Sequence, residues 1–295
     1  MSETIIGENV MGCEICGKEV ASPIRLTYDG EHTFCCHDCV IEYISAKGLG
    51  PASIKRQRNE VIHQIEVERK SKLITMIHRI EHDGEKAQYI TIEDAEDIIH
   101  EIRSTPENVP IDFLIHCSGG LVLPAEQIAM AMKERKSPTT VIVPHYAMSG
   151  ATLIALAAKE ILMDSHSVLG SLDPQIQGLP SPSLLKLLEY KKPEFIRDEM
   201  LIAIDIASKS ISQMRNFIKY LLRERMGEDK SSKVAEFLTG GYITHDKPIT
   251  AKDAALLGLP VRVGIPESFY KLLRLYKFGS SKHDSMYSKS CSCLQ

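Results

Sequence analysis

The sequence predicts an α/β fold in which helices cover both faces of a parallel sheet, preceded by a small cysteine-rich module. Between residues 71 and 270, short apolar runs alternate with amphipathic segments of helical period. Strands joined by crossover helices form parallel sheets, so this alternation indicates the sheet. Five of the eight cysteines lie within the first 39 residues. A cluster this dense is typical of a metal site in a reducing compartment rather than of a disulfide framework.

The chain divides into four expected regions. Residues 1–46 form the cysteine-rich module, 47–70 a connector helix, 71–278 the α/β domain and 279–295 a polar tail expected to be disordered. The connector carries many charges with apolar residues at helical spacing. It is interpreted either as a solvated linker or as an oligomerisation helix.

The elements of the large region follow from hydrophobic periodicity and capping signals. Apolar runs predict strands over 73–79, 111–117, 140–144 and 160–163. Amphipathic stretches predict helices over 91–103, 124–135, 149–159, 183–192 and 197–225. Thr91 is expected to cap its helix in a box with Asp94, and Pro124 is expected at the first helical position. The Gly/Ser-rich turns after Cys117 and Met148 should lie at the carboxyl ends of strands, where ligand chemistry gathers.

Composition excludes several classes of protein. Hydrophobic residues make up 43% and charged residues 25% of the chain, which is ordinary for a globular protein. The net charge of −4 and the absence of Trp argue against a nucleic-acid partner. No apolar run approaches the roughly 18 residues of a membrane span, and no secretory signal is visible. A cytoplasmic location is therefore expected.

The first 39 residues predict one structural Zn²⁺ site with four thiolate ligands. Cys13 and Cys16 form one pair, and Cys39 forms the second with either Cys35 or Cys36. Four thiolates close a tetrahedron around zinc, and a module this small has no adequate core without metal. The segment resembles treble-clef-like knuckles of the TRASH/YHS type, and that resemblance favours Cys35. His32 and His37 are interpreted as exposed polar residues rather than substitute ligands.

Two turns indicate the chemistry. Gly119 and Gly120 end a strand, and glycines allow backbone N–H groups to face outward and hold an oxyanion. Ser149 lies at a strand-to-helix turn among small residues, as a nucleophilic serine does. The alternative role of Ser149 is a helix N-cap, which serine favours whatever the function. The Gly-Gly turn one strand–helix unit earlier makes the nucleophile the preferred interpretation.

From about residue 72 to residue 266 the chain resembles the serine dehydrogenase proteinase family, within the signal peptide peptidase A and Clp protease group on the crotonase-like fold. The matching segments are 77–79, 111–112, 118–123, 125–129, 143–150, 153–158, 168–175, 244–250 and 257–260. The resemblance implies an ATP-independent serine peptidase acting on peptides or unfolded proteins, and a homo-oligomer. It implies Ser149 as the nucleophile, with an oxyanion hole made by Gly119 or Gly120 together with Gly150.

The general base is the open part of this assignment. Clp proteases place a His about 25 residues after the serine, where this chain has Asp173 instead. Signal peptide peptidase A enzymes use a Lys, for which Lys209 is the first candidate, because small neighbours would let it be desolvated. Asp173 is a candidate orienting residue. Further candidates for the base are Lys191, Lys192, His116, His145 and His166.

Two other functions remain open on the sequence. A cysteine knuckle before a crotonase-like domain is also the plan of the zinc-bearing carboxyltransferase subunit of acetyl-CoA carboxylase, where the oxyanion hole would hold a thioester enolate. A non-catalytic zinc-bearing assembly protein is the third alternative. Ser149 and the segment-by-segment match favour the peptidase.

Overall fold

The computed structural model describes residues 11–16, 19–20, 24–27, 31–35, 39–40, 43, 47, 51–78 and 89–276. The tail expected over 279–295 lies outside the described residues, as do Cys36 and His37. The small N-terminal module contains the strands β1 (Met11–Gly12), β2 (Glu19–Val20), β3 (Ile24–Thr27) and β4 (Glu31–Phe34). β1 pairs with β2 and β3 with β4, both antiparallel.

The large domain is built on five parallel strands, four of which the sequence predicts; the fifth, β14, is not predicted. They are β5 (Lys72–Ile77), β6 (Ile111–His116), β7 (Thr139–Val143), β9 (Glu160–Met163) and β14 (Val261–Val263). Their order across the sheet is β14-β9-β7-β6-β5, and every neighbouring pair is parallel. Every residue of β6 and β7 is buried, because helices cover both faces of the sheet.

One face of the sheet packs against α3 (Ile92–Ser104), α4 (Val122–Glu134) and α5 (Gly150–Ala157). The other face packs against α2 (Pro51–Arg69) and α10 (Glu267–Leu275). Alternate strand residues divide between the two cores, as the two-residue period requires: Phe113 and Ile115 face the first core, and Leu114 faces the second. The expected connector helix is therefore α2, and it covers one face of the sheet through Ile62 and Ile65.

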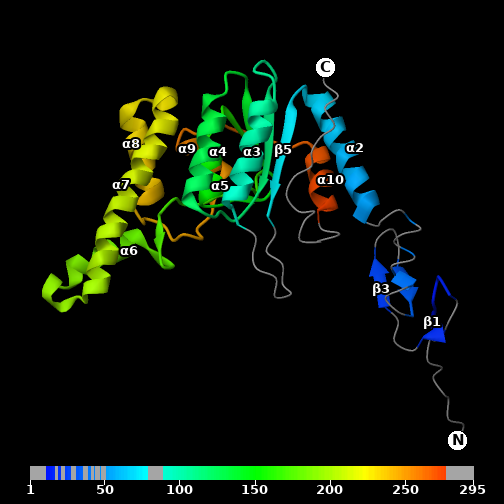
Figure 1. Ribbon diagram of the computed structural model, residues 1–295, viewed down its shortest axis with the longest axis horizontal. Helices are drawn as coiled ribbons and strands as arrows, with labels where there is room; N and C mark the ends of the chain where they lie inside the picture. The colour runs from blue at the N-terminus through cyan, green and yellow to red at the C-terminus, as the bar shows by residue number, and fades with distance from the viewer. Residues whose placement is uncertain are drawn as a thin grey trace, which may run out of the picture.

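The remaining helices extend the domain on the side away from α2 (Figure 1). They are α6 (Ser181–Tyr190), a short 3₁₀ turn η1 (Pro193–Phe195), α7 (Asp198–Met226), α8 (Glu228–Thr239) and α9 (Ala251–Leu256). α6 and the start of α7 form an arm that projects from the domain (Figure 1). No helix in the described part of the chain is long and apolar enough to span a membrane.

A second, smaller sheet lies at the carboxyl edge of the large one. It consists of β8 (Tyr146–Ala147), β10 (Val168–Leu169) and β13 (Ile249–Thr250), in the order β13-β10-β8. β10 runs parallel to β8 and antiparallel to β13. A hairpin of β11 (Gln175–Ile176) and β12 (Leu179–Pro180) follows. This small sheet brings a late segment of the chain beside the residues that follow β7.

Helix starts follow the capping signals with one correction. Thr91 and Asp94 form the expected capping box at α3. The expectation for Pro124 is wrong, because α4 begins two residues earlier, at Val122. Pro124 still falls in the first turn of α4, where a backbone N–H has no partner within the helix.

A buried polar group joins β5, α3 and β6. His78, directly after β5, has Nδ1 3.2 Å from Cys117 Sγ, directly after β6. Its Nε2 forms an ion pair at 3.5 Å with Asp94, and both side chains are fully buried. Burial alone would lower the pKa of His78, but Asp94 and Cys117 together outweigh burial and raise the pKa to about 9.

The raised pKa makes the stability depend on pH. The protonated state of His78 stabilises the fold fully below the unfolded pKa near 6.5, and this contribution disappears as the pH rises through about 9. Urea unfolding at pH 6 and pH 9.5 should show a loss of up to about 3 kcal/mol in the wild type that His78→Gln does not show. His63→Gln, at an exposed histidine of α2, should behave as the wild type. If the free energy of unfolding changes with pH by the same amount in the wild type and in His78→Gln, the raised pKa of His78 is contradicted.

Candidate active site

Ser149 lies in a strained turn between β8 and α5. Its backbone has φ 48° and ψ −123°, a left-handed region that a residue with a side chain rarely adopts. Ser149 occupies the N-cap position of α5, but its side chain makes no capping hydrogen bond. A serine retained for capping would have the extended backbone and the capping bond that Thr91 shows. The geometry therefore matches a serine presented to a ligand rather than a cap.

The Gly-Gly turn after β6 packs directly on the serine turn. The backbone N–H of Met148 donates to Cys117 O at 2.9 Å, which ties the two turns together. A Cβ on Gly119 would lie 2.7 Å from Ser149 Cβ, and one on Gly120 would lie 2.2 Å from the backbone nitrogen of Ile90. Gly119 also has φ +112°. No residue with a side chain fits at either position, because the neighbouring atoms belong to backbone or to Cβ.

The two glycines differ in where their N–H groups point. The N–H of Gly119 donates to Cys117 Sγ at 3.2 Å, so it is already engaged. The N–H groups of Gly120 and Gly150 donate to no acceptor among the described residues. A Cβ on Gly150 would lie 3.7 Å from the nitrogen of Gly120, so the two glycines are neighbours in space. Two unengaged N–H groups beside Ser149 form an arrangement that can receive an oxyanion.

The small sheet places a histidine next to Asp173. His245 Nδ1 lies 2.8 Å from Asp173 Oδ1, although 72 residues separate them in sequence. β13 runs antiparallel to β10, with Val168 opposite Thr250, so the segment before β13 and the segment after β10 leave the small sheet on the same side. Gly170, three residues before Asp173, packs on the serine turn, since a Cβ there would be 3.1 Å from the nitrogen of Ser149.

Both oxygens of Asp173 are held in place. Ser171 Oγ donates to Oδ1 at 2.6 Å, and Gln175 Nε2 donates to Oδ2 at 2.7 Å. Burial alone would raise the pKa of Asp173, but His245 and Ser171 outweigh burial and lower the pKa. The same carboxylate raises the pKa of His245 above its ordinary value, against the opposing effect of burial. The carboxylate thus fixes the ring through Nδ1, and the side chain of His245 remains 34% exposed.

The lysine candidates do not have the environment expected of a base. Lys209 was expected to be desolvated, but its side chain is 68% exposed and pairs with Asp205 one helical turn away. The desolvation that would prepare a lysine to act as a base is therefore absent at Lys209. Lys191 and Lys192 are also exposed.

The histidines near the site have other surroundings. His116 is buried, with its ring centroid 4.2 Å from that of Tyr146. His145 and His166 line a hollow of about 400 Å³ between the end of β9 and α10, where Tyr270 donates to Asp164 at 2.6 Å. Our sequence reasoning missed His245 because it searched the spacing typical of Clp proteases and the late lysines. The available signal was the histidine within segment 244–250, one of the segments that carry the resemblance.

Four cysteines of the N-terminal module converge as a metal site would require. The sulfur atoms of Cys13, Cys16, Cys35 and Cys39 all lie within 4.8 Å of one another. Zinc held by four thiolates at about 2.3 Å places its sulfur ligands about 3.8 Å apart, so the cluster is compatible with such a site. Backbone hydrogen bonds, the one from Cys16 first, lower the pKa of Cys13 to about 6. His32 instead contacts Glu14 and Tyr43.

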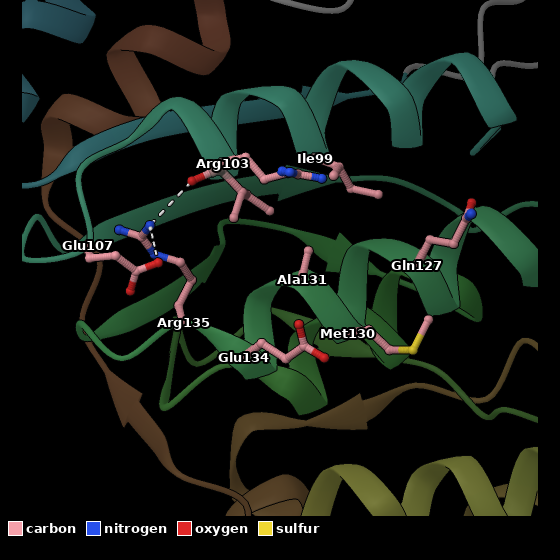
Figure 2. A pocket seen from close by; sticks show the side chains of 9 residues that line it. Ile99, Arg103, Glu107, Gln127, Met130, Ala131, Glu134 and Arg135 are labelled. Atoms are coloured by element: carbon pink, nitrogen blue, oxygen red, sulfur yellow. Dashed lines mark hydrogen bonds and ion pairs between the residues drawn. The ribbon is translucent and has the colours of Figure 1, made fainter.

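Two larger hollows open on opposite sides of α4. The first, of about 470 Å³, lies between α3 and the end of α4 and is lined by charges of both signs (Figure 2). The guanidinium of Arg135 donates hydrogen bonds to backbone carbonyls of the loop after α3, among them those of Thr105 and Pro106. It also donates to the hydroxyl of Ser137. This hollow lies at the amino-terminal edge of the sheet, away from Ser149.

The second hollow, which we call the Glu126 hollow, has a volume of about 770 Å³. It is lined by Val122 and Glu126 of α4, by residues 174–176 and by the face of α7 between Ser210 and Tyr220. Val122 of its first wall lies two residues after Gly120, and Pro174 of its second wall directly follows Asp173. It therefore adjoins the serine turn.

Comparisons with known proteins agree with the family that the sequence resembles. The family model of the ClpP-like SDH-type serine proteinase matches residues 43–290. The uncharacterized protein MJ0137 of Methanocaldococcus jannaschii is 48% identical over 238 residues, which covers 79% of this chain and 83% of that protein. MJ1495 of the same organism is 46% identical over 235 residues, with coverage of 78% and 80%.

Among solved structures, a point mutant of ClpP1 from Listeria monocytogenes aligns over 70% of this chain and 99% of its own, with 14% identity and a TM-score of 0.43. That score is too low to support an argument, so the assignment rests on the family model and the parallel α/β sheet. The match extends over most of the sequence, including α2 and the whole α/β domain. The chain belongs to the ClpP-like SDH-type serine proteinase family.

Proposed function

We propose that the protein is a serine peptidase that cleaves peptides or unfolded proteins without ATP, with Ser149 as its nucleophile. The family supports peptidase chemistry, and one observation supports this residue above others. Ser149 holds a strained, non-capping conformation against a Gly-Gly turn whose Gly120 N–H is unengaged. Neither the carboxyltransferase nor the non-catalytic alternative explains a strained serine in this place.

We further propose His245 as the general base and Asp173 as the residue that orients it, in place of Lys209. Asp173 accepts from Nδ1, which leaves Nε2 of His245 to take the proton of Ser149 Oγ. The oxygen then attacks the substrate carbonyl, and Gly120 and Gly150 donate to the oxyanion. His245 returns the proton to the leaving amine, and an acyl group remains on Ser149. Water activated by His245 then hydrolyses this ester.

The exposed apolar residues of the arm support a homo-oligomer. Leu188, Tyr190, Phe195, Ile202 and Ile206 are all between 43% and 78% exposed on α6, η1 and α7. Apolar side chains gathered on a projecting element are typical of contacts between protein chains. We propose that copies of this chain associate through the arm.

We also propose that the cysteine cluster holds one structural Zn²⁺. Four thiolates leave no open position, so the ion would supply folding energy to the module and no step of the peptidase reaction. A site made of four thiolates favours a reducing compartment such as the cytoplasm.

Ser149→Ala should abolish peptide cleavage while leaving the fold intact. Loss of the nucleophile should lower kcat by at least about 10³-fold. Because the hydroxyl makes no capping bond, the melting temperature should change by no more than about 2 °C. Thr91→Ala is the matched control: it removes a hydroxyl that does cap a helix, so it should cost about 1 kcal/mol and preserve activity. Retained cleavage in Ser149→Ala would refute the assignment.

The pH profile should identify the base. A histidine base must be neutral, so kcat/KM should fall as the pH drops below the pKa of His245, which Asp173 raises above 6.5. Asp173→Asn should therefore move the acidic limb to lower pH and reduce the maximal rate. His245→Gln should remove most of the activity, and Lys209→Ala should retain it. The reverse result for His245→Gln and Lys209→Ala would show that the lysine is the base.

Elemental analysis should find about one zinc per chain. Cys35→Ser should lose the metal, because Cys35 Sγ lies with those of Cys13, Cys16 and Cys39, and Cys36→Ser should keep it. Bound zinc should also decrease in acid, as protons compete for the thiolates. Absence of zinc from protein purified without chelator, or loss of zinc in Cys36→Ser alone, would contradict the proposed ligand set.

A further inference from the structure

The Glu126 hollow has walls that are direct continuations of the proposed reaction centre. Val122 and Glu126 belong to the first turns of α4, which begins two residues after Gly120. Ala125, next to Glu126, packs on the serine turn, because a Cβ on Gly150 would lie 3.1 Å from Ala125 Cβ. The opposite wall starts at Pro174, the residue after Asp173. A side chain of a substrate whose carbonyl carbon faces Ser149 therefore has this hollow beside it.

A single charge lines this hollow. Glu126 is the only ionisable acid or base among the lining residues apart from Tyr220. It has no ion pair with any residue in the described part of the chain, although Lys133 on α4 pairs with Glu224 and Lys219 on α7 pairs with Glu228. These two lysines therefore pair with other carboxylates and not with Glu126. Burial raises the pKa of Glu126 with no opposing partner, so its carboxylate lacks the compensation that a cation would give.

The rest of the lining suits the stem of a long side chain. Met214 and Phe217 of α7 and Ile176 of β11 offer apolar surface, along which the methylene groups of lysine or arginine pack while the charged head reaches a carboxylate. Gln213 and Asn216 add amide oxygens that accept hydrogen bonds from a cationic head. An acidic substrate side chain would find the repulsion of Glu126 and no basic group in the lining.

From these observations we infer that the Glu126 hollow receives a lysine or arginine side chain of the peptide substrate, with Glu126 as its counter-ion. This inference rests on the proposed peptidase function and narrows its substrate class to peptides with a basic residue near the cleaved bond. Norleucine shares the stem of lysine without the charge, so the pair separates the effect of charge from that of packing.

Quenched fluorescent peptides provide the test. In a peptide scanned with lysine, norleucine or glutamate at each position around the cleavage site, one position should show kcat/KM at least about 10-fold higher for lysine than for norleucine, and lowest for glutamate. Glu126→Gln should reduce the lysine-to-norleucine ratio to near 1, and Glu126→Lys should invert the preference between lysine and glutamate. Glu134→Gln, at the other hollow of α4, should leave the ratio unchanged.

Binding to Ser149→Ala separates this inference from the proposed function. Fluorescence polarisation of the same peptides on this variant should show the same preference for lysine, which Glu126→Gln in the same background should remove. Binding preference without cleavage by the wild type would refute the peptidase and keep the basic-side-chain site. If the lysine and norleucine peptides show equal kcat/KM in cleavage, or equal affinity in binding, at every position, the inference is overturned. Glu126→Asp, which keeps the charge, should retain part of the preference and controls for misfolding.

Discussion

The close contact between the Gly119–Gly120 turn and the serine turn is the constraint on which the rest of the structure depends. Gly120 lies against the backbone of Ile90 and Gly119 against Ser149 Cβ, so the two turns approach as closely as backbones can. The approach is held by hydrogen bonds between the chain after β6 and the chain after β7. These bonds form only where adjacent parallel strands end together, which is why the carboxyl edge of this sheet carries the chemistry.

The small sheet brings a late segment of the chain, which contains His245 and β13, to the carboxyl edge of the large sheet. β10 pairs with β8, which ends two residues before Ser149, and with β13, which begins four residues after His245. Three two-residue strands provide little stability alone, but each continues from a helix or strand packed in the main core. The paired register ends at Leu169 and Ile249, so it brings the two segments near each other, and the side-chain contact between Asp173 and His245 completes the approach.

Local patterns predicted the local features. Continuous apolar runs gave the strands of the large sheet, because strands buried on both faces need no alternation, and the Ser149 and Gly-Gly turns are visible as short motifs. His245 was not predictable in the same way, since its place in the site depends on its contact with Asp173, which lies 72 residues earlier in the chain. The expected desolvation of Lys209 is wrong for the opposite reason: its small neighbours suggested burial, and Ala207 is buried, but the lysine side chain itself faces solvent and pairs with Asp205. The start of α4 was misplaced because Pro124 is tolerated anywhere in a first turn.

The buried pair of His78 and Asp94 behind the Gly-Gly turn is best understood through its effect on geometry. An ion pair removed from water gives little net stability compared with apolar side chains of the same volume. Here, however, His78 also contacts Cys117, whose sulfur accepts the N–H of Gly119. That bond engages the N–H of Gly119 and leaves the next N–H, that of Gly120, without an acceptor among the described residues, close to Gly150. The Asp94 carboxylate in turn accepts the backbone N–H of Thr91 at the start of α3, a bond that does not involve the Thr91 hydroxyl. A chain of contacts therefore runs from a helix terminus to the orientation of one peptide group, and we interpret the buried charges as the means of holding that peptide in a single orientation.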